Sequence, residues 1–518
     1  MEDTTMKKIK TENILLAAIL TGALTVSAFA ACSITSESTS SNKETGAAET
    51  QASTTETSAV LSSTISEKDK DPGYDEATAE VITLNGGTAS SDSSAVSING
   101  SVVTIKGKGT FVITGTLDDG YIVVDAGDSD DIQIVLKGVN ITSSDYAALY
   151  CLNAYNVYIT LADGTTNILK NSGEFDSKDK NSVDGAIFAK TDITINGTGS
   201  LEVISTDHGI VGKDDVTITG GTVKVTASSD GIQANDSVSV QEATIDITCG
   251  KDGIQADNDK DATQGYVYIE SGNITIAADD DGITASSTLQ IDGGTIDITK
   301  SYEGLEGETV TINGGTVSIV SSDDAINAAS DSSTEAMRDD GVSNIRINGG
   351  DIYIRSEGDG VDSNGTLAMT GGNLTVMGPT KGANGSLDVN GSAAITGGTV
   401  IMAGTSSMAT NFTDASQGTI LLSTGSQSEG SEIKVTDSSG NVIIETTAGC
   451  SYECIVVSSP DLVTGNTYTV TAGSYSESIT LSSNIYGAGG MGGPGGGFPG
   501  GGDFPGGGPG GGRGGPGF

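Results

Sequence analysis

Six acidic residues recur in one short motif, in which the acid is followed by glycine or alanine and then by an aliphatic residue. They are Asp230, Asp252, Asp281, Glu303, Asp324 and Asp359. If the chain winds with this period, the six carboxylates lie one above another, about 4.8 Å apart. Like charges this close repel unless they are protonated or neutralised, and clustered hard oxygen atoms favour Ca²⁺. The column therefore predicts bound calcium, and the alternative is that each acid caps its own corner by bonding to the backbone.

A second feature is the length of chain between the acidic motif and the next glycine turn. This spacing is twelve residues in most copies, but it is 19 after Gly253 and 25 after Ala325. The extra residues, about 257–264 and 329–343, leave the winding at the same corner and three coils apart, roughly 14 Å along its axis. Insertions on one side of a solenoid typically mark its binding face, so the two insertions predict the walls of a cleft. The alternative is variation in length without a role.

The residues predicted to bind a ligand lie in these insertions and on the short coils between them. They are Asp257, Asp259, Ser286, Glu306, Glu308, Arg338, Asp339 and Asp340.

The elements that position these residues are short strands. Val216 and Ile218 alternate with threonines, two glycines interrupt the run, and Val223 and Val225 then alternate again. A third short strand follows the acidic motif, with Ile232 and an alanine directed inward. Three strands in about 22 residues make one coil of a right-handed parallel β-helix, an all-β fold. We predict this helix over residues 74–404 and a small β unit over residues 405–485 that covers its open end.

Composition narrows the possible functions. The chain has 518 residues, 75 glycines, no tryptophan and a formal net charge of −44. A phosphate backbone would be repelled by this charge, so nucleic acid is excluded as a partner. The acidic surface instead suits an exported body that binds cations.

The two ends of the chain predict export and flexible segments. Residues 1–32 contain a basic start, an apolar run and small residues before Cys32, as in a bacterial lipoprotein signal. A lipid on Cys32 would be the only link to a membrane, and the alternative is cleavage after Ala30 and free secretion. Residues 33–73 have the composition of a disordered spacer, and residues 486–518 have that of a flexible Gly/Pro-rich tail.

Several local motifs resemble those of a known family, the exported bacterial carbohydrate-binding proteins with a right-handed parallel β-helix. The motifs are residues 107–111 (GKGTF), 115–120 (GTLDDG), 138–142 (GVNIT), 161–165 (LADGT) and 456–462 (VVSSPDL), together with the acidic repeats. The fold of this family is similar to that of polysaccharide lyases. The resemblance implies calcium on the coils and binding of cellulose or of acidic sugars such as polygalacturonate, without demonstrated catalysis. It assigns no ligand residue in this chain.

The sequence thus predicts a monomeric, surface-tethered protein that binds polysaccharide with the help of Ca²⁺ and has no assigned catalytic residue. His208 is the only histidine, and no Ser/His/Asp set can be assembled around it. One alternative is a calcium-dependent polysaccharide lyase, for which Arg338 or Lys381 would have to supply the base. A second alternative is a structural adhesin that binds another protein.

Overall fold

The computed structural model describes residues 61, 65–178, 180–258, 260–330 and 339–487. The predicted signal segment and Cys32 lie outside these residues, as does most of the Gly/Pro-rich tail. In the part of the chain that is described, no helix has the length and apolar character needed to cross a membrane.

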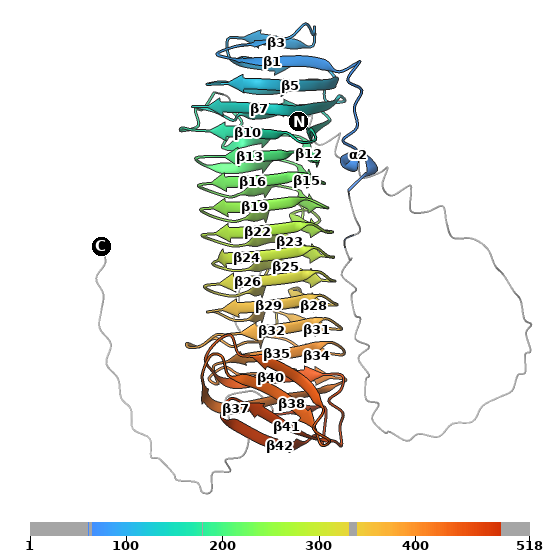
Figure 1. The fold of residues 1–518 in the computed structure, drawn as a ribbon, viewed down its shortest axis with the longest axis vertical. Helices are drawn as coiled ribbons and strands as arrows, with labels where there is room; N and C mark the ends of the chain where they lie inside the picture. Colours follow the sequence, from blue (N-terminus) through green and yellow to red (C-terminus); the bar gives the residue numbers. More distant parts are fainter. Residues whose placement is uncertain (1–60, 62–64, 179, 259, 331–338, 488–518) are drawn as a thin grey trace, which may run out of the picture. The chain divides into compact units, whose positions relative to one another are not determined.

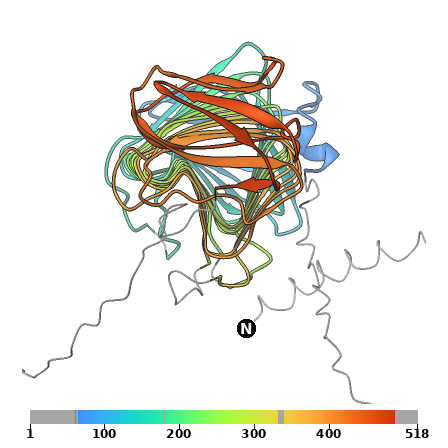
Figure 2. The ribbon, with the colours of Figure 1, turned by 90° about the horizontal axis from the view of Figure 1, so that it is seen from below.

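The strands stack coil upon coil, which confirms the right-handed parallel β-helix (Figure 1). One coil consists of β17 (Ile232–Ala234), β18 (Ser237–Val240) and β19 (Thr244–Cys249). The next coil repeats it with β20 (Ile254–Ala256), β21 (Tyr266–Ile269) and β22 (Asn273–Ala278). Each strand pairs in parallel with its equivalent one coil away, so Ile232 lies beside Ile254 and Val238 lies beside Val267. Seen along the stack, successive coils superpose (Figure 2).

This stacking builds three parallel faces, which we number in the order in which a coil visits them. Face 1 contains β4 (Val102–Ile105), β6 (Tyr121–Asp125), β8 (Leu149–Asn153), β11 (Gly185–Ala189), β14 (His208–Gly212), β17, β20, the first parts of β23 (Ile283–Ile291) and β25 (Leu305–Ile312), β27 (Ile326–Ala328), β30 (Val361–Ser363) and β33 (Asp388–Val389). Face 2 contains β1 (Glu80–Gly86), β5 (Gly109–Leu117), β7 (Asp131–Ser143), β9 (Asn156–Leu161), β12 (Asp192–Gly197), β15 (Asp215–Ile218), β18, β21, the second parts of β23 and β25, β28 (Asn344–Ile347), β31 (Thr366–Met369), β34 (Ala393–Ile395) and β36 (Asp414–Ala415). Face 3 contains the end of β7, β10 (Thr166–Asn171), β13 (Ser200–Ile204), β16 (Thr222–Ala227), β19, β22, β24 (Thr295–Ser301), β26 (Thr316–Ser321), β29 (Asp351–Ser356), β32 (Asn373–Met377) and β35 (Thr399–Gly404).

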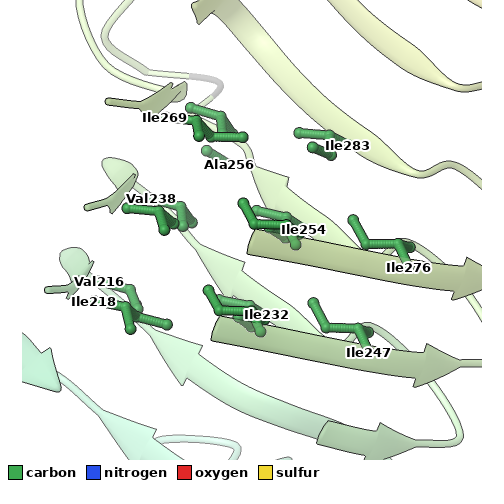
Figure 3. Close-up of a cluster of buried hydrophobic side chains, with 14 of the residues drawn as sticks. Val216, Ile218, Ile232, Val238, Ile247, Ile254, Ala256, Ile269, Ile276 and Ile283 are labelled. Atoms are coloured by element: carbon green, nitrogen blue, oxygen red, sulfur yellow. The ribbon is translucent and has the colours of Figure 1, made fainter. Parts of the chain in front are cut away.

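The core is a column of aliphatic side chains inside the coils. Period-2 alternation directs one set of residues inward on every strand, as in β16, where exposed and buried residues alternate. Ile232, Ile254 and Ile283 from face 1 stack above one another beside Ile247 and Ile276 from face 3 (Figure 3). All five are at most 1% exposed.

Two kinds of glycine permit this geometry. The second glycine of each Gly-Gly turn before face 3 has a positive φ, as at Gly221 (78°) and Gly294 (92°), a conformation that side chains disfavour. The glycine of the acidic motif is required for a different reason, which is close packing between coils. A Cβ on Gly253 would lie 2.5 Å from the carbonyl oxygen of Gly282 in the next coil and 2.5 Å from a methyl group of Ile276.

Antiparallel strands cover both open ends of the stack. At the first coil, β2 (Ala89–Ser90) pairs with β1 and β3 (Val96–Asn99) pairs with β4. At the last coil, β40 (Tyr452–Ser459) pairs with β35 and with β37 (Gly418–Gln427), beside which lies β43 (Ile485–Tyr486). A separate four-stranded sheet orders β39 (Val442–Thr447), β38 (Glu432–Asp437), β41 (Thr467–Ala472) and β42 (Tyr475–Thr480). This is the predicted small C-terminal β unit.

Residues 65–73 differ from the predicted disordered spacer. They contain the short helix α2 (Glu67–Lys70) and lie against face 2. The hydroxyl of Thr194 donates to Asp69 Oδ1 (2.7 Å), and the amide of Asn196 donates to the Asp69 carbonyl (3.0 Å). Ile65 is buried as well, but most of these contacts are polar, so the segment carries no apolar pattern and composition alone could not reveal it. The four cysteines of the described residues are buried and free.

The close approach at Gly253 gives a test of the fold. We expect Gly253→Ala to lower the free energy of unfolding by about 1–3 kcal/mol, because the methyl group would overpack a closed interior. The measurement is the midpoint of urea unfolding followed by circular dichroism. Gly87→Ala is the control, because no atom lies within 4 Å of its Cβ position and its φ is not positive. Equal midpoints for both variants would contradict the packing argument.

Candidate functional site

The six acids of the repeated motif lie at the entry to face 1, where the structure brings them into one column. Backbone N–H groups link four of the five steps between neighbouring rungs, and within the described residues the step from Glu303 to Asp324 has no such bond. The N–H of Asp252 donates to Asp230 Oδ1 (3.2 Å), that of Asp281 to Asp252 Oδ1 (3.1 Å), and that of Glu303 to Asp281 Oδ1 (2.9 Å). At the far end, the N–H of Asp359 donates to Asp324 Oδ1 (2.6 Å). Except for Glu303, the acids therefore cap corners as the alternative predicted, but the corner that each one caps belongs to the following coil.

His208 occupies the first rung of this column. The N–H of Asp230 approaches its Nδ1 at 3.3 Å, and the same nitrogen lies 2.9 Å from Asp230 Oδ2. Although burial opposes it, the hydrogen bond and the charge of Asp230 raise the pKa of His208. The lone histidine thus serves the end of the column as a structural group.

A second column, which the sequence analysis missed, runs beside the first on the outward side of face 1. Register pairs place its members one above another. They are Gln233, Gln255, Thr284, Glu306, Asn327, Asp362 and Asp388. Each motif acid and the member three residues later belong to one coil, and this three-residue offset was the signal available in the sequence.

Amides of the second column donate to carboxylates of the first. Gln255 Nε2 donates to Asp252 Oδ2 (2.7 Å), and Asn327 Nδ2 donates to Glu303 Oε2 (2.9 Å). Gln233 Nε2 lies 2.9 Å from Gln255 Oε1, which links neighbouring coils. These donors offset negative charge where the outward residue is an amide.

At the last coils, acids replace the amides of the second column. Asp324, Asp359 and Asp362 each offer a carboxylate oxygen, and these oxygens lie within 4.8 Å of one another. Asn327 lies directly beside Asp362 in the register, and its buried Oδ1 accepts no hydrogen bond from the described residues. Asp252, Asp280 and Asp281 form a second such group. Carboxylate and amide oxygens of this kind are the ligands that Ca²⁺ takes.

Burial and mutual repulsion raise the pKa of six acids of the two columns. Burial raises the pKa of Asp252 and Glu303 to about 7, and that of Asp324 to about 6. Burial, with repulsion from neighbouring acids, raises the pKa of Glu306 and of Asp362 to about 8. A hydrogen bond from the Gly385 N–H opposes burial at Asp359, whose pKa is still raised to about 7. The column therefore holds protons near neutral pH unless a cation takes their place.

Both insertions leave the coils between face 1 and face 2. The first lies between β20 and β21, and the second lies between β27 and β28. The N–H of Asn258 in the first insertion donates to Ser286 Oγ (3.1 Å), so the insertion is fixed to the following coil. Glu306 points outward on face 1, while Glu308 lies in the middle of β25, where the chain passes from face 1 to face 2.

The other predicted wall residues have local roles or lie outside the described residues. Asp339 Oδ1 accepts from the Gly341 N–H (2.9 Å), and Asp340 Oδ1 accepts from the Ser343 N–H (2.8 Å). Although burial opposes it, hydrogen bonds led by that of the Ser343 hydroxyl lower the pKa of Asp340. Both carboxylates thus close turns of their own loop. Asp259 and Arg338 lie outside the described residues, and Asp257 begins the first insertion.

Comparisons with known proteins find a matching family model, a relative and a similar solved structure. The model of a family of carbohydrate-binding domain-containing proteins matches residues 99–338. A carbohydrate-binding domain-containing protein of Acetivibrio thermocellus is 38% identical over 133 residues, which are 25% of this chain and 46% of that protein. A polysaccharide lyase-like protein from C. thermocellum, solved as a gadolinium derivative, is 33% identical with a TM-score of 0.41, over 46% of this chain and 92% of that one. The chain thus spans about half the length of the curated relative that it matches.

The raised pKa values predict how stability depends on pH. The folded chain binds more protons than the unfolded chain between about pH 4, the ordinary carboxyl value, and the folded values of about 7 to 8. We therefore expect the free energy of unfolding, measured in chelator by urea titration, to fall by at least about 2 kcal/mol as the pH rises through this window.

Asp362→Asn provides the matched variant, because it removes one titrating group and keeps the shape of the side chain. Its stability should fall less steeply between pH 5 and pH 8, since one fewer buried charge has to form. A flat profile for the unsubstituted chain, or identical slopes for both chains, would contradict the assignment of raised pKa values to this column.

Proposed function

We propose that the chain binds polysaccharide on face 1 without catalysing its cleavage, and the match of residues 99–338 to the model of a family of carbohydrate-binding domain-containing proteins supports this proposal. The observation that carries this proposal is the second column of face 1. It presents amide, hydroxyl and carboxyl groups in register on successive coils, about 4.8 Å apart. Such groups bond to sugar hydroxyls, and their regular spacing suits a repeating linear chain.

The positions of the two insertions also favour face 1 as the binding face. They border face 1 on one side, and the rungs of Asp281 and Glu303 lie between them. In this arrangement Glu306, which belongs to the second column, and the Ser286 hydroxyl lie where a bound polysaccharide chain would pass. Cellulose and acidic polysaccharides such as polygalacturonate are the ligand classes to test first.

Calcium is the second part of the proposal. We assign it to the group of Asp324, Asp359 and Asp362, because three carboxylates meet there and Asn327 adds an unpaired carbonyl oxygen. Asp324 and Asp359 each accept one backbone N–H and keep their other oxygen for an ion. A bound cation would offset the burial and repulsion that raise the pKa of Asp324, Asp359 and Asp362, and it would attract the carboxylate of an acidic sugar.

Tethering completes the proposed function. A lipid on Cys32 would hold the protein at the outer surface of a bacterial cell, and the polar residues that follow would act as a spacer. Binding on the side of a β-helix then captures extended polysaccharide next to the cell. Free secretion remains the alternative for the same folded body.

The experiment is a pull-down of the full chain on insoluble polysaccharides, neutral and acidic, with Ca²⁺ and with chelator. We expect retention on at least one polysaccharide, and retention on acidic polysaccharide should fall at least about tenfold in chelator. Absence of retention on every polysaccharide would refute the proposal and favour a protein adhesin. Release of unsaturated uronides, read by ultraviolet absorbance, would instead establish the lyase alternative.

Asp362→Asn tests the calcium assignment directly. It should weaken Ca²⁺ binding in a calorimetric titration by about tenfold, because one of three converging carboxylates loses its charge. Asp246→Asn is the control, since Asp246 is exposed on β19 of face 3 and belongs to neither acidic group. Equal affinities for the two variants would place the ion elsewhere.

A further inference from the structure

Face 2 carries a guanidinium group in a neutral setting. Arg346 lies at the centre of the outward side of β28, between Asn344 and Asn348. Register pairs place it beside Thr311 of the preceding coil and Ala368 of the following coil. The outward neighbours that complete this patch are also uncharged, and they are Thr309, Asn313, Thr366 and Thr370. In a chain with 68 acidic residues, this arginine therefore has no acid among its immediate neighbours in the sheet.

Arg346 also has no ion-pair partner within the described residues. Several lysines are paired, as Lys137 is with Glu76 (2.9 Å) and Lys434 is with Glu445 (2.8 Å). Arg346 is half-buried, and this burial lowers its pKa below the usual value. A guanidinium that has lost water and gained no carboxylate is ready to bind an anion, since its planar fork matches a carboxylate.

The patch has small side chains and hydrogen-bonding groups around the cation. Ala368 and then Ala394 follow Arg346 along the stack, so the next two coils carry only methyl groups at this position, and Asp414 follows them. On one side, Asn344 Nδ2 donates to Thr309 Oγ1 (3.0 Å), while the buried Asn344 Oδ1 accepts no hydrogen bond from the described residues. On the other side, a ladder joins Asn313, Asn348 and the Thr370 hydroxyl (both bonds 2.8 Å). These hydroxyls and amides fit the hydroxyls of a sugar ring on either side of a carboxylate.

We propose that the patch around Arg346 is a second carbohydrate subsite, which takes the carboxylate of a uronic acid residue in an acidic polysaccharide. This inference rests on the proposed polysaccharide binding and adds a contact that needs no calcium. This subsite differs from face 1 in the sign of its charge, because its positive charge belongs to an arginine of the chain and not to a bound ion. An acidic polysaccharide would therefore contact face 1 through bound ions and face 2 through Arg346.

The test uses the full chain labelled with ¹⁵N-arginine, which has only four arginines. Arg346→Gln removes one Nε–H signal and so identifies it. In chelator, an oligogalacturonate should shift the Arg346 signal, whereas the matched neutral galactose oligomer should not. The affinity for the oligogalacturonate should fall about tenfold in Arg346→Gln. The affinity of Arg346→Lys should lie between those of the unsubstituted chain and Arg346→Gln, because the charge remains and the planar fork is lost.

Arg355→Gln is the matched control, because Arg355 lies exposed on face 3 in the same coil, and it should leave the affinity unchanged. An Arg346 signal that does not move at saturating oligogalacturonate, with the polysaccharide pull-down still positive, would overturn the subsite and leave the proposed function standing. A negative pull-down together with a moving Arg346 signal would overturn the proposed function on face 1 and support the subsite. Equal affinities for Arg346→Gln and Arg355→Gln would also overturn the subsite around Arg346.

Discussion

The parallel pairing of each strand with its equivalent one coil away is the constraint on which the whole molecule depends. It satisfies the backbone, and it places every residue beside the residue that occupies the same position in the next coil, as at Ile232 and Ile254. For aliphatic residues this repetition produces a continuous core. For glycines such as Gly253 it leaves no space for a side chain. For charged residues it has a cost, because a repeated acid stands about 4.8 Å from its copy.

The chain offsets this cost in two ways along face 1. Backbone N–H groups of the following coil donate to most of the stacked carboxylates, and amides such as Gln255 and Asn327 donate to others. Where Asp362 and Asp388 stand in place of amides, neither device is sufficient, and the pKa of Asp362 is raised to about 8. Asp362 and Asp388 thus add carboxylates where earlier coils carry amides, beside Asp324 and Asp359, and this concentration of acids is the physical reason for placing a cation there.

The repeat made the coil, the stacked acids and the shared corner of the two insertions predictable, because each of these follows from counting residues. The amide column was missed because Gln255 and Asn327 look like ordinary outward polar residues until their side-chain directions are known. Residues 65–73 were assigned to a spacer because their contacts use one buried isoleucine, one lysine and scattered polar groups, which leave no periodic signal. Ser286 was predicted to line the cleft from its position between the insertions, whereas its bond to the Asn258 N–H depends on the path of the loop.

The two proposed binding faces differ in how an acidic polysaccharide would overcome the negative charge of the protein. On face 1, repulsion between the column and a uronate would exceed any hydrogen bond, so binding there requires an intervening cation. On face 2, Arg346 is surrounded by hydroxyls, amides and methyl groups, and a uronate meets positive charge directly. Because the two mechanisms respond differently to chelation, a chain with both can retain acidic polysaccharide as calcium falls and hold it more firmly as calcium rises.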